Sequence, residues 1–115
     1  MANTFKVITK AGVTSADVIY TVAGSTTTII LGLMLGNTTG GSSNATVTLG
    51  TDTANRAGAN NEPNQDVELL TTTAIAANTT LELMSGNKVV MEATDTLSVT
   101  GSAALEVVLS VMEIT

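Results

Sequence analysis

Acidic side chains are the main candidates for chemistry in this sequence, which contains 10 Asp and Glu residues but no His and no Cys. The absence of His removes the commonest general base and metal ligand. The absence of Cys removes thiolate nucleophiles, thiolate metal sites and disulfides. Glycoside hydrolysis needs two carboxylates in a cleft, usually beside aromatic sugar platforms, and the chain has no Trp. No Ser lies in a GxSxG context. We therefore expect a protein that is not an enzyme and that binds no cofactor.

A weak pattern of oxygen ligands surrounds the polar segment TDTANRAGANNEPNQDV at residues 51–67. Asp52, Glu62 and Asp66 could hold Ca²⁺, but no DxDxDG calcium loop is present. Flexible acidic loops are common, so no metal site is predicted. The segment lacks Ile, Leu, Val and aromatic side chains between Asp52 and Gln65. It is therefore expected to be a long polar loop at residues 51–64, and loops of this length are usually functional or disordered.

The charge distribution argues against binding to nucleic acid or to a membrane. The net charge is −6, whereas phosphate neutralisation needs clustered Lys and Arg. The N-terminus has no apolar stretch behind a basic start, so no signal peptide is expected. The most apolar run, IILGLML at residues 29–35, is far too short to span a bilayer. We expect a protein that is made in a cytoplasm and has no membrane partner.

Short apolar and polar alternations separated by Gly, Asn and Ser turns are typical of an all-β domain. Thr and Val are abundant, and both favour strands over helices. The pattern predicts about nine short strands at the spacing of an antiparallel β-sandwich. No linker or internal repeat is present, so residues 1–115 are expected to form a single β-sandwich domain with helix content near zero.

Two of the expected strands carry apolar residues on both faces. If Ile29, Leu31, Leu33 and Leu35 face the core, the next residues along the chain must face outward. The same holds for the last strand, where Leu105, Val107, Leu109 and Val111 are expected to be buried. The outward set then comprises Ile30, Gly32, Met34, Val108, Met112 and Ile114. Local loops could cover such a face, but 115 residues leave little spare chain, and large apolar patches mark association sites. We interpret this set as an oligomer interface.

Several phrases of the sequence resemble the small virion structural proteins of tailed phages, particularly marine cyanophages. The phrases are MANTFKVITKAGV, YTVAGSTTTIILGLMLGN, SGNKVVMEATDTLSV and LSVMEIT. The resemblance covers most of the chain but not residues 51–64, and it rests on strand phrases rather than on catalytic residues. It implies a β-sandwich or jelly-roll module on the surface of the particle.

The resemblance also implies a function and partners. We expect a capsid decoration, or cement, protein that forms a homotrimer on the phage shell and contacts the major capsid protein or other virion proteins. The alternative is a tail, baseplate or fibre component that contacts other virion proteins or the host surface. Exposed Tyr or Trp would be expected of a sugar-binding surface, and the chain has one Tyr and no Trp, so the decoration role is favoured.

Two segments are expected to contact these partners. The first is the N-terminal strand with Phe5. The second is the polar loop, where Arg56 could form a forked pair with a carboxylate and Asn60, Asn61 and Pro63 could lie against a neighbour. The alternative for the loop is a disordered surface segment.

Overall fold

The computed structural model describes residues 2–51, 64–84 and 86–115, which form strands connected by turns and loops. Within these ranges the chain has nine β-strands and no helix. No part of the described chain is therefore a helix that could cross a membrane. The strands are β1 (Asn3–Val13), β2 (Asp17–Thr21), β3 (Thr27–Asn37), β4 (Ser43–Thr51), β5 (Gln65–Ile75), β6 (Thr79–Glu82), β7 (Val89–Met91), β8 (Thr96–Gly101) and β9 (Leu105–Ile114).

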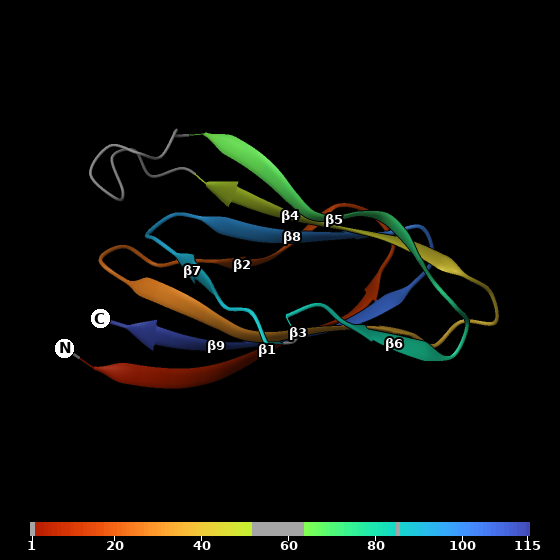
Figure 1. Cartoon of the computed structure of the whole chain (residues 1–115), viewed down its shortest axis with the longest axis horizontal. Helices are drawn as coiled ribbons and strands as arrows, with labels where there is room; N and C mark the ends of the chain where they lie inside the picture. The colour runs from red at the N-terminus through yellow and green to blue at the C-terminus, as the bar shows by residue number, and fades with distance from the viewer. Residues whose placement is uncertain (1, 52–63, 85) are drawn as a thin grey trace.

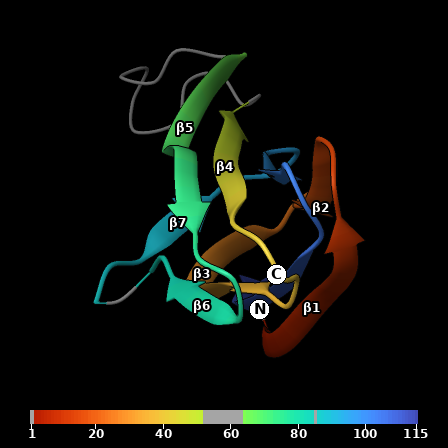
Figure 2. The same cartoon turned by 90° about the vertical axis from the view of Figure 1, so that its right-hand side faces the viewer.

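The strands form two antiparallel sheets that lie face to face (Figures 1 and 2). Sheet A has the order β1-β9-β3-β6, with β7 also paired with β3, and sheet B has the order β2-β8-β4-β5. β6 pairs with the end of β3 and β7 with its beginning, so together they act as one interrupted strand. With β6 and β7 counted as one, the order and connections are those of a jelly roll. The expected single-domain sandwich is confirmed.

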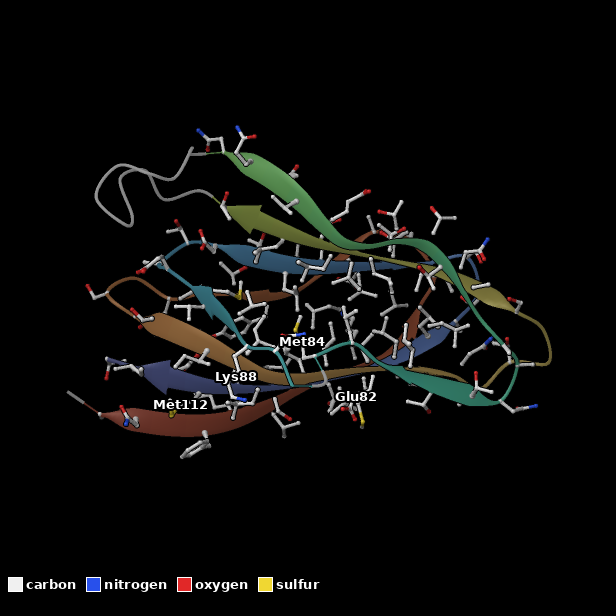
Figure 3. All side chains as sticks on the ribbon, in the orientation of Figure 1. Glu82, Met84, Lys88 and Met112 are labelled. Atoms are coloured by element: carbon white, nitrogen blue, oxygen red, sulfur yellow. The ribbon has the colours of Figure 1, made fainter. Side chains whose placement is uncertain are left out.

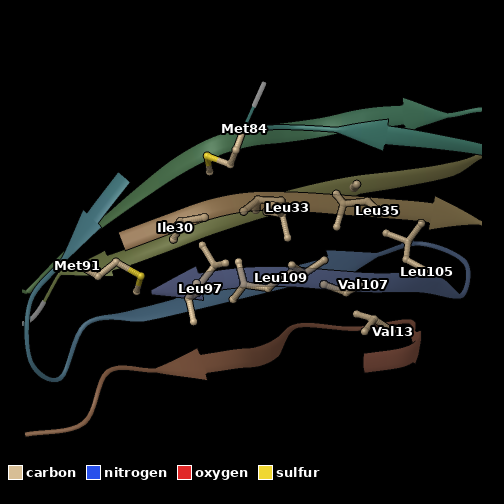
Figure 4. Packing of buried hydrophobic residues seen from close by; sticks show 14 of the residues in the cluster. Val13, Ile30, Leu33, Leu35, Met84, Met91, Leu97, Leu105, Val107 and Leu109 are labelled. Atoms are coloured by element: carbon tan, nitrogen blue, oxygen red, sulfur yellow. The ribbon is translucent and has the colours of Figure 1, made fainter. Parts of the chain in front are cut away.

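The core lies between the two sheets and is built from aliphatic and Met side chains (Figure 4). On β9, Leu105, Val107, Leu109 and Val111 are buried, as their alternation predicts. Each buried Leu or Val contributes roughly 1.5–3 kcal/mol of transfer free energy. The side chains that meet between the sheets include Ile30, Leu33, Leu35, Met84, Met91 and Leu97.

Hydrogen bonds join the ends of neighbouring strands at two places in this sandwich. The backbone amides of Ala2 and Thr115 each donate to the other's carbonyl oxygen, at 3.1 and 3.0 Å, and Figure 1 shows the two termini side by side. On sheet B, Thr51 at the end of β4 is paired with Gln65 at the start of β5. The Thr51 hydroxyl also donates to the Gln65 carbonyl oxygen at 3.1 Å. The hairpin ends of β4 and β5 are therefore fixed to each other.

Candidate assembly surface

The outer face of sheet A carries a row of apolar side chains that crosses four strands. Phe5 on β1 lies opposite Met112 on β9, Met112 lies opposite Ile29 on β3, and Ile29 lies opposite Val90 on β7. Phe5 is 71% exposed and Val90 is 51% exposed. Strands are spaced about 4.8 Å apart, so the row extends over roughly 14 Å of surface. A solvated strand face normally carries polar side chains, whereas all four side chains in this row are apolar.

A second part of the same face has small residues at its centre. Ser110 on β9 lies opposite Val7 on β1 and Gly32 on β3. A Cβ built on Gly32 would meet nothing within 4 Å. Beyond these small residues, Met34 lies opposite Val108. Small residues between larger apolar ones leave space in which a neighbouring side chain or backbone can approach closely.

The expectation for Ile30 was wrong. Ile30 is fully buried in the core, whereas Ile29 and Leu31, which were expected in the core, are only partly buried. The cause is a β-bulge, since the register of β3 with β9 shifts between Ile30 and Gly32. One extra residue in a strand reverses the faces of all residues on one side of it. Gly32 and Met34 lie after the bulge and do face outward. The outer face of β9 presents Val108, Met112 and Ile114, which are partly buried.

The outer face of sheet B is mainly polar and provides an internal comparison. One row across this face consists of Val18, Ser98, Thr48 and Glu68, and another consists of Thr96, Gly50 and Asp66. Hydroxyl and carboxylate groups of this kind are suited to contact with water. The two outer faces of the sandwich therefore differ in chemistry, since sheet A carries a row of four apolar side chains, whereas Val18 is the apolar residue in these two rows of sheet B.

Charged residues lie at the β6 and β7 edge of the apolar face. Glu82 lies opposite Met34, and Lys88 precedes β7. Figure 3 shows Glu82, Lys88 and Met112 projecting from the side of sheet A that faces away from sheet B. Within the described ranges the ion pairs are Lys6–Glu113 and Lys10–Asp17, so in this part of the chain Lys88 has no carboxylate partner. An apolar centre with a charged margin is the usual composition of a protein–protein interface.

A polar cluster lies between the two sheets beside β1. Lys6 Nζ is 2.8 Å from Glu113 Oε1. The Tyr20 hydroxyl donates to Glu113 Oε2 at 2.5 Å and lies 2.8 Å from Thr28 Oγ1. The Lys6 contact, followed by the Tyr20 hydrogen bond, lowers the pKa of Glu113. Burial, followed by the hydrogen bond to Glu113, raises the pKa of Tyr20 to about 12. The cluster connects β1 and β9 of sheet A with β2 of sheet B.

Only some of the other residues that were considered for binding a partner or Ca²⁺ lie in the described part of the chain. Phe5 lies on the apolar face, beside Met112. Arg56, Asn60, Asn61 and Pro63 lie outside the described residues. Of the three acids considered for Ca²⁺, Asp52 and Glu62 also lie outside them. Asp66 lines a shallow hollow of about 300 Å³ with Gly50, Thr51, Asn64, Thr94 and Thr96. The described ranges contain no group of three acidic residues that could hold a metal ion.

Sequence reasoning missed Val7, Val90 and the polar cluster. Val7 is 64% exposed, and its alternation with Lys6 was visible in the sequence. The Tyr20–Glu113 hydrogen bond joins residues 93 positions apart, and no local pattern indicates such a contact. Val90 is in a three-residue strand, which is too short for alternation to show which face its side chains occupy.

Comparisons with known proteins found a match among solved structures but none among protein families or curated proteins. Among solved structures, the chain is similar to one described as "Bacillus endospore appendages form a novel family of disulfide-linked pili". The likeness covers 99% of this chain and 87% of that chain, with 14% sequence identity and a TM-score of 0.48.

Proposed function

We propose that this chain is a structural virion protein of a tailed phage, a capsid decoration protein that forms a homotrimer on the shell. Its role is mechanical rather than catalytic: it joins copies of itself and neighbouring shell subunits by burying apolar surface. The phrases that resemble phage virion proteins support the setting. The contacts between copies use the outer face of sheet A, which includes the N-terminal strand, and contacts to the major capsid protein use residues 51–64.

The observation that carries this proposal is the difference between the two outer faces of the sandwich. Phe5, the chain's single Phe, is 71% exposed, and Val7 is 64% exposed on the same strand. Fully burying a Phe or Val side chain contributes roughly 1.5–3 kcal/mol. A row that also contains Met112, Ile29 and Val90 adds to the apolar surface that a neighbouring copy would bury. Contiguous exposed apolar surface of this kind marks association sites.

Labelling of intact particles tests the proposal. Antibodies against the purified chain are bound to phage particles that encode it and are located by gold-labelled electron microscopy. Regular labelling of the head is the expected result. Labelling confined to the tail would favour the tail, baseplate or fibre alternative. Particles that carry no label, while the host lysate contains the chain, would contradict a virion role.

A further inference from the structure

In a sandwich, a strand normally turns its apolar side chains toward the opposite sheet and its charged side chains toward solvent. Much of the edge strand β1 has the reverse arrangement. Phe5 and Val7 face outward and are largely exposed. Lys6 lies opposite Val111 and Lys10 lies opposite Val107, so both lysines are on the side that faces sheet B. Ile8 is the partly buried apolar residue between them. Burial within a single subunit would favour the reverse arrangement, with Phe5 and Val7 turned inward.

A β-bulge determines which side faces outward. Val13 lies opposite Leu105 and Lys10 lies opposite Val107, so Ala11 and Gly12 together face the single residue Glu106. Gly12 has a φ of +70°, a conformation that glycine adopts readily. If the pairing of Val13 continued without this extra residue, Val7 would lie opposite Val111 and Phe5 opposite Glu113. Every side chain from Asn3 to Lys10 would then change face.

Contacts to Lys6 exist only in the observed register. Lys6 Nζ reaches Glu113 Oε1 at 2.8 Å, and the side chain of Glu113 is only 13% exposed. The Tyr20 hydroxyl donates to the second oxygen of Glu113, and the fully buried Thr28 lies against Tyr20. Lys10 Nζ approaches Asp17 Oδ2 at 3.4 Å. In the shifted register both lysines would point away from these carboxylates, and Glu113 would lose its cation.

We propose that Lys6, Glu113 and Tyr20 form a register lock that keeps Phe5 and Val7 on the outer face of sheet A. The lock opposes the tendency of β1 to slip by one residue and to bury these two side chains in its own subunit. Lys6, Glu113 and Tyr20 are thus positioning residues for the apolar face. The consequence for assembly rests on the proposed function, whereas the register itself is a property of one subunit. A buried polar residue is known to fix the register of helices in coiled coils, and the polar contacts of Lys6 act on the register of a strand by the same principle.

Thiol labelling measures the register directly, because the chain has no Cys. Val7→Cys and Ile8→Cys are made separately, each in the natural background and combined with Lys6→Met. Met keeps the apolar length of the side chain and removes its charge. Labelling is performed at a concentration where sedimentation velocity shows single subunits. In the natural background, Cys at position 7 should react about tenfold faster than Cys at position 8, because exposed sites need no local opening.

The lock predicts that Lys6→Met reverses this order, with position 7 protected and position 8 reactive. Gly12→Ala should produce the same reversal by a separate route, since a Cβ disfavours the positive φ of the bulge. Lys88→Met, which removes the lysine with no carboxylate partner in the described part of the chain, should leave the order unchanged. If both positions become reactive in Lys6→Met, β1 merely frays and the proposal is wrong. Unchanged rates in both Lys6→Met and Gly12→Ala would also overturn it. Neither result depends on where the protein is found on a particle.

Discussion

Phe5 and Met112 lie directly opposite each other on neighbouring strands of sheet A, and both side chains point away from the core. Phe5 was expected to contact a partner and Met112 to lie in an oligomer interface, and the antiparallel pairing of β1 with β9 places them on one surface. A partner that covers Met112 must therefore also approach Phe5. The N-terminal strand is part of the same apolar face rather than a separate arm.

Substitution of Gly101 tests how tightly the chain is packed at the turn between β8 and β9. A Cβ at this position would lie 2.7 Å from the Val13 carbonyl oxygen and 2.8 Å from the Ala103 carbonyl oxygen. Backbone atoms cannot yield as a flexible side chain can, so Gly101→Ala should destabilise the fold by about 1–3 kcal/mol. Gly24→Ala is the matched control, because a Cβ there meets nothing within 4 Å. Urea denaturation measures both. Equal stabilities of the two variants would show that the β8–β9 turn is looser than described.

The stability of the fold should decrease in acid because of Glu113. Its pKa is lowered from the ordinary value of 4.5 by Lys6 and then by Tyr20. A lowered pKa in the folded state adds stability above the unfolded value, and this stability is lost as the pH falls through the folded value. Thermal melts below pH 4.5 should therefore show a smaller loss for Glu113→Gln than for the natural chain. Parallel losses in the two proteins would contradict this assignment.

Tyr20 should act at the opposite end of the pH range. Burial, followed by the hydrogen bond to Glu113, raises its pKa to about 12. A raised pKa means that the folded state favours the protonated hydroxyl, so stability is complete below the ordinary value of 10.0 and is lost between there and about pH 12. Tyr20→Phe should remove this part of the alkaline decline. Absorbance titration of the single tyrosinate in the natural chain gives the pKa independently, and a midpoint near 10 would contradict the buried hydrogen bond.

Residues 53–63 should affect attachment rather than folding. Thr51 and Gln65 are paired across the hairpin, so a short Gly-Ser turn in place of residues 53–63 should close β4 onto β5 with little change in melting temperature. Under the proposed function, this variant should bind less tightly to undecorated phage shells, because the charge pair expected of Arg56 with the shell is lost. Binding is measured by cosedimentation with the shells. Equal binding by the shortened and natural chains would show that the segment makes no contact.

The sequence was sufficient to predict the alternation of the long strands but not the positions of the bulges. Leu105, Val107, Leu109 and Val111 occupy the core as expected because β9 is regular along its whole length. Ile30 did not follow the prediction because a bulge after it reverses the faces of the preceding part of β3. A bulge depends on how a strand pairs with its neighbour, and the hydrophobic pattern of one strand contains little information about that pairing.

The apolar face was therefore predicted in part, and the contacts that orient β1 were not. Met34, Val108 and Met112 follow from simple alternation on β3 and β9. Lys6 and Glu113 are far apart in the sequence and meet only because the first and last strands are neighbours in sheet A. Such a pair becomes predictable only after the strand order is known.

The measurement that tests the central claim most directly is sedimentation equilibrium of the purified chain and of two substitutions. Met112→Lys places a charge in the apolar row, between Phe5 and Ile29, and Thr48→Lys places the same charge on the outer face of sheet B. We predict that the natural chain and Thr48→Lys form trimers at micromolar concentration. Met112→Lys should sediment as a folded monomer, because burying an unpaired charge at an interface costs several kcal/mol. A natural chain that stays monomeric at these concentrations, or a Met112→Lys variant that assembles as tightly as the natural chain, would contradict the assignment of the sheet A face as the assembly surface.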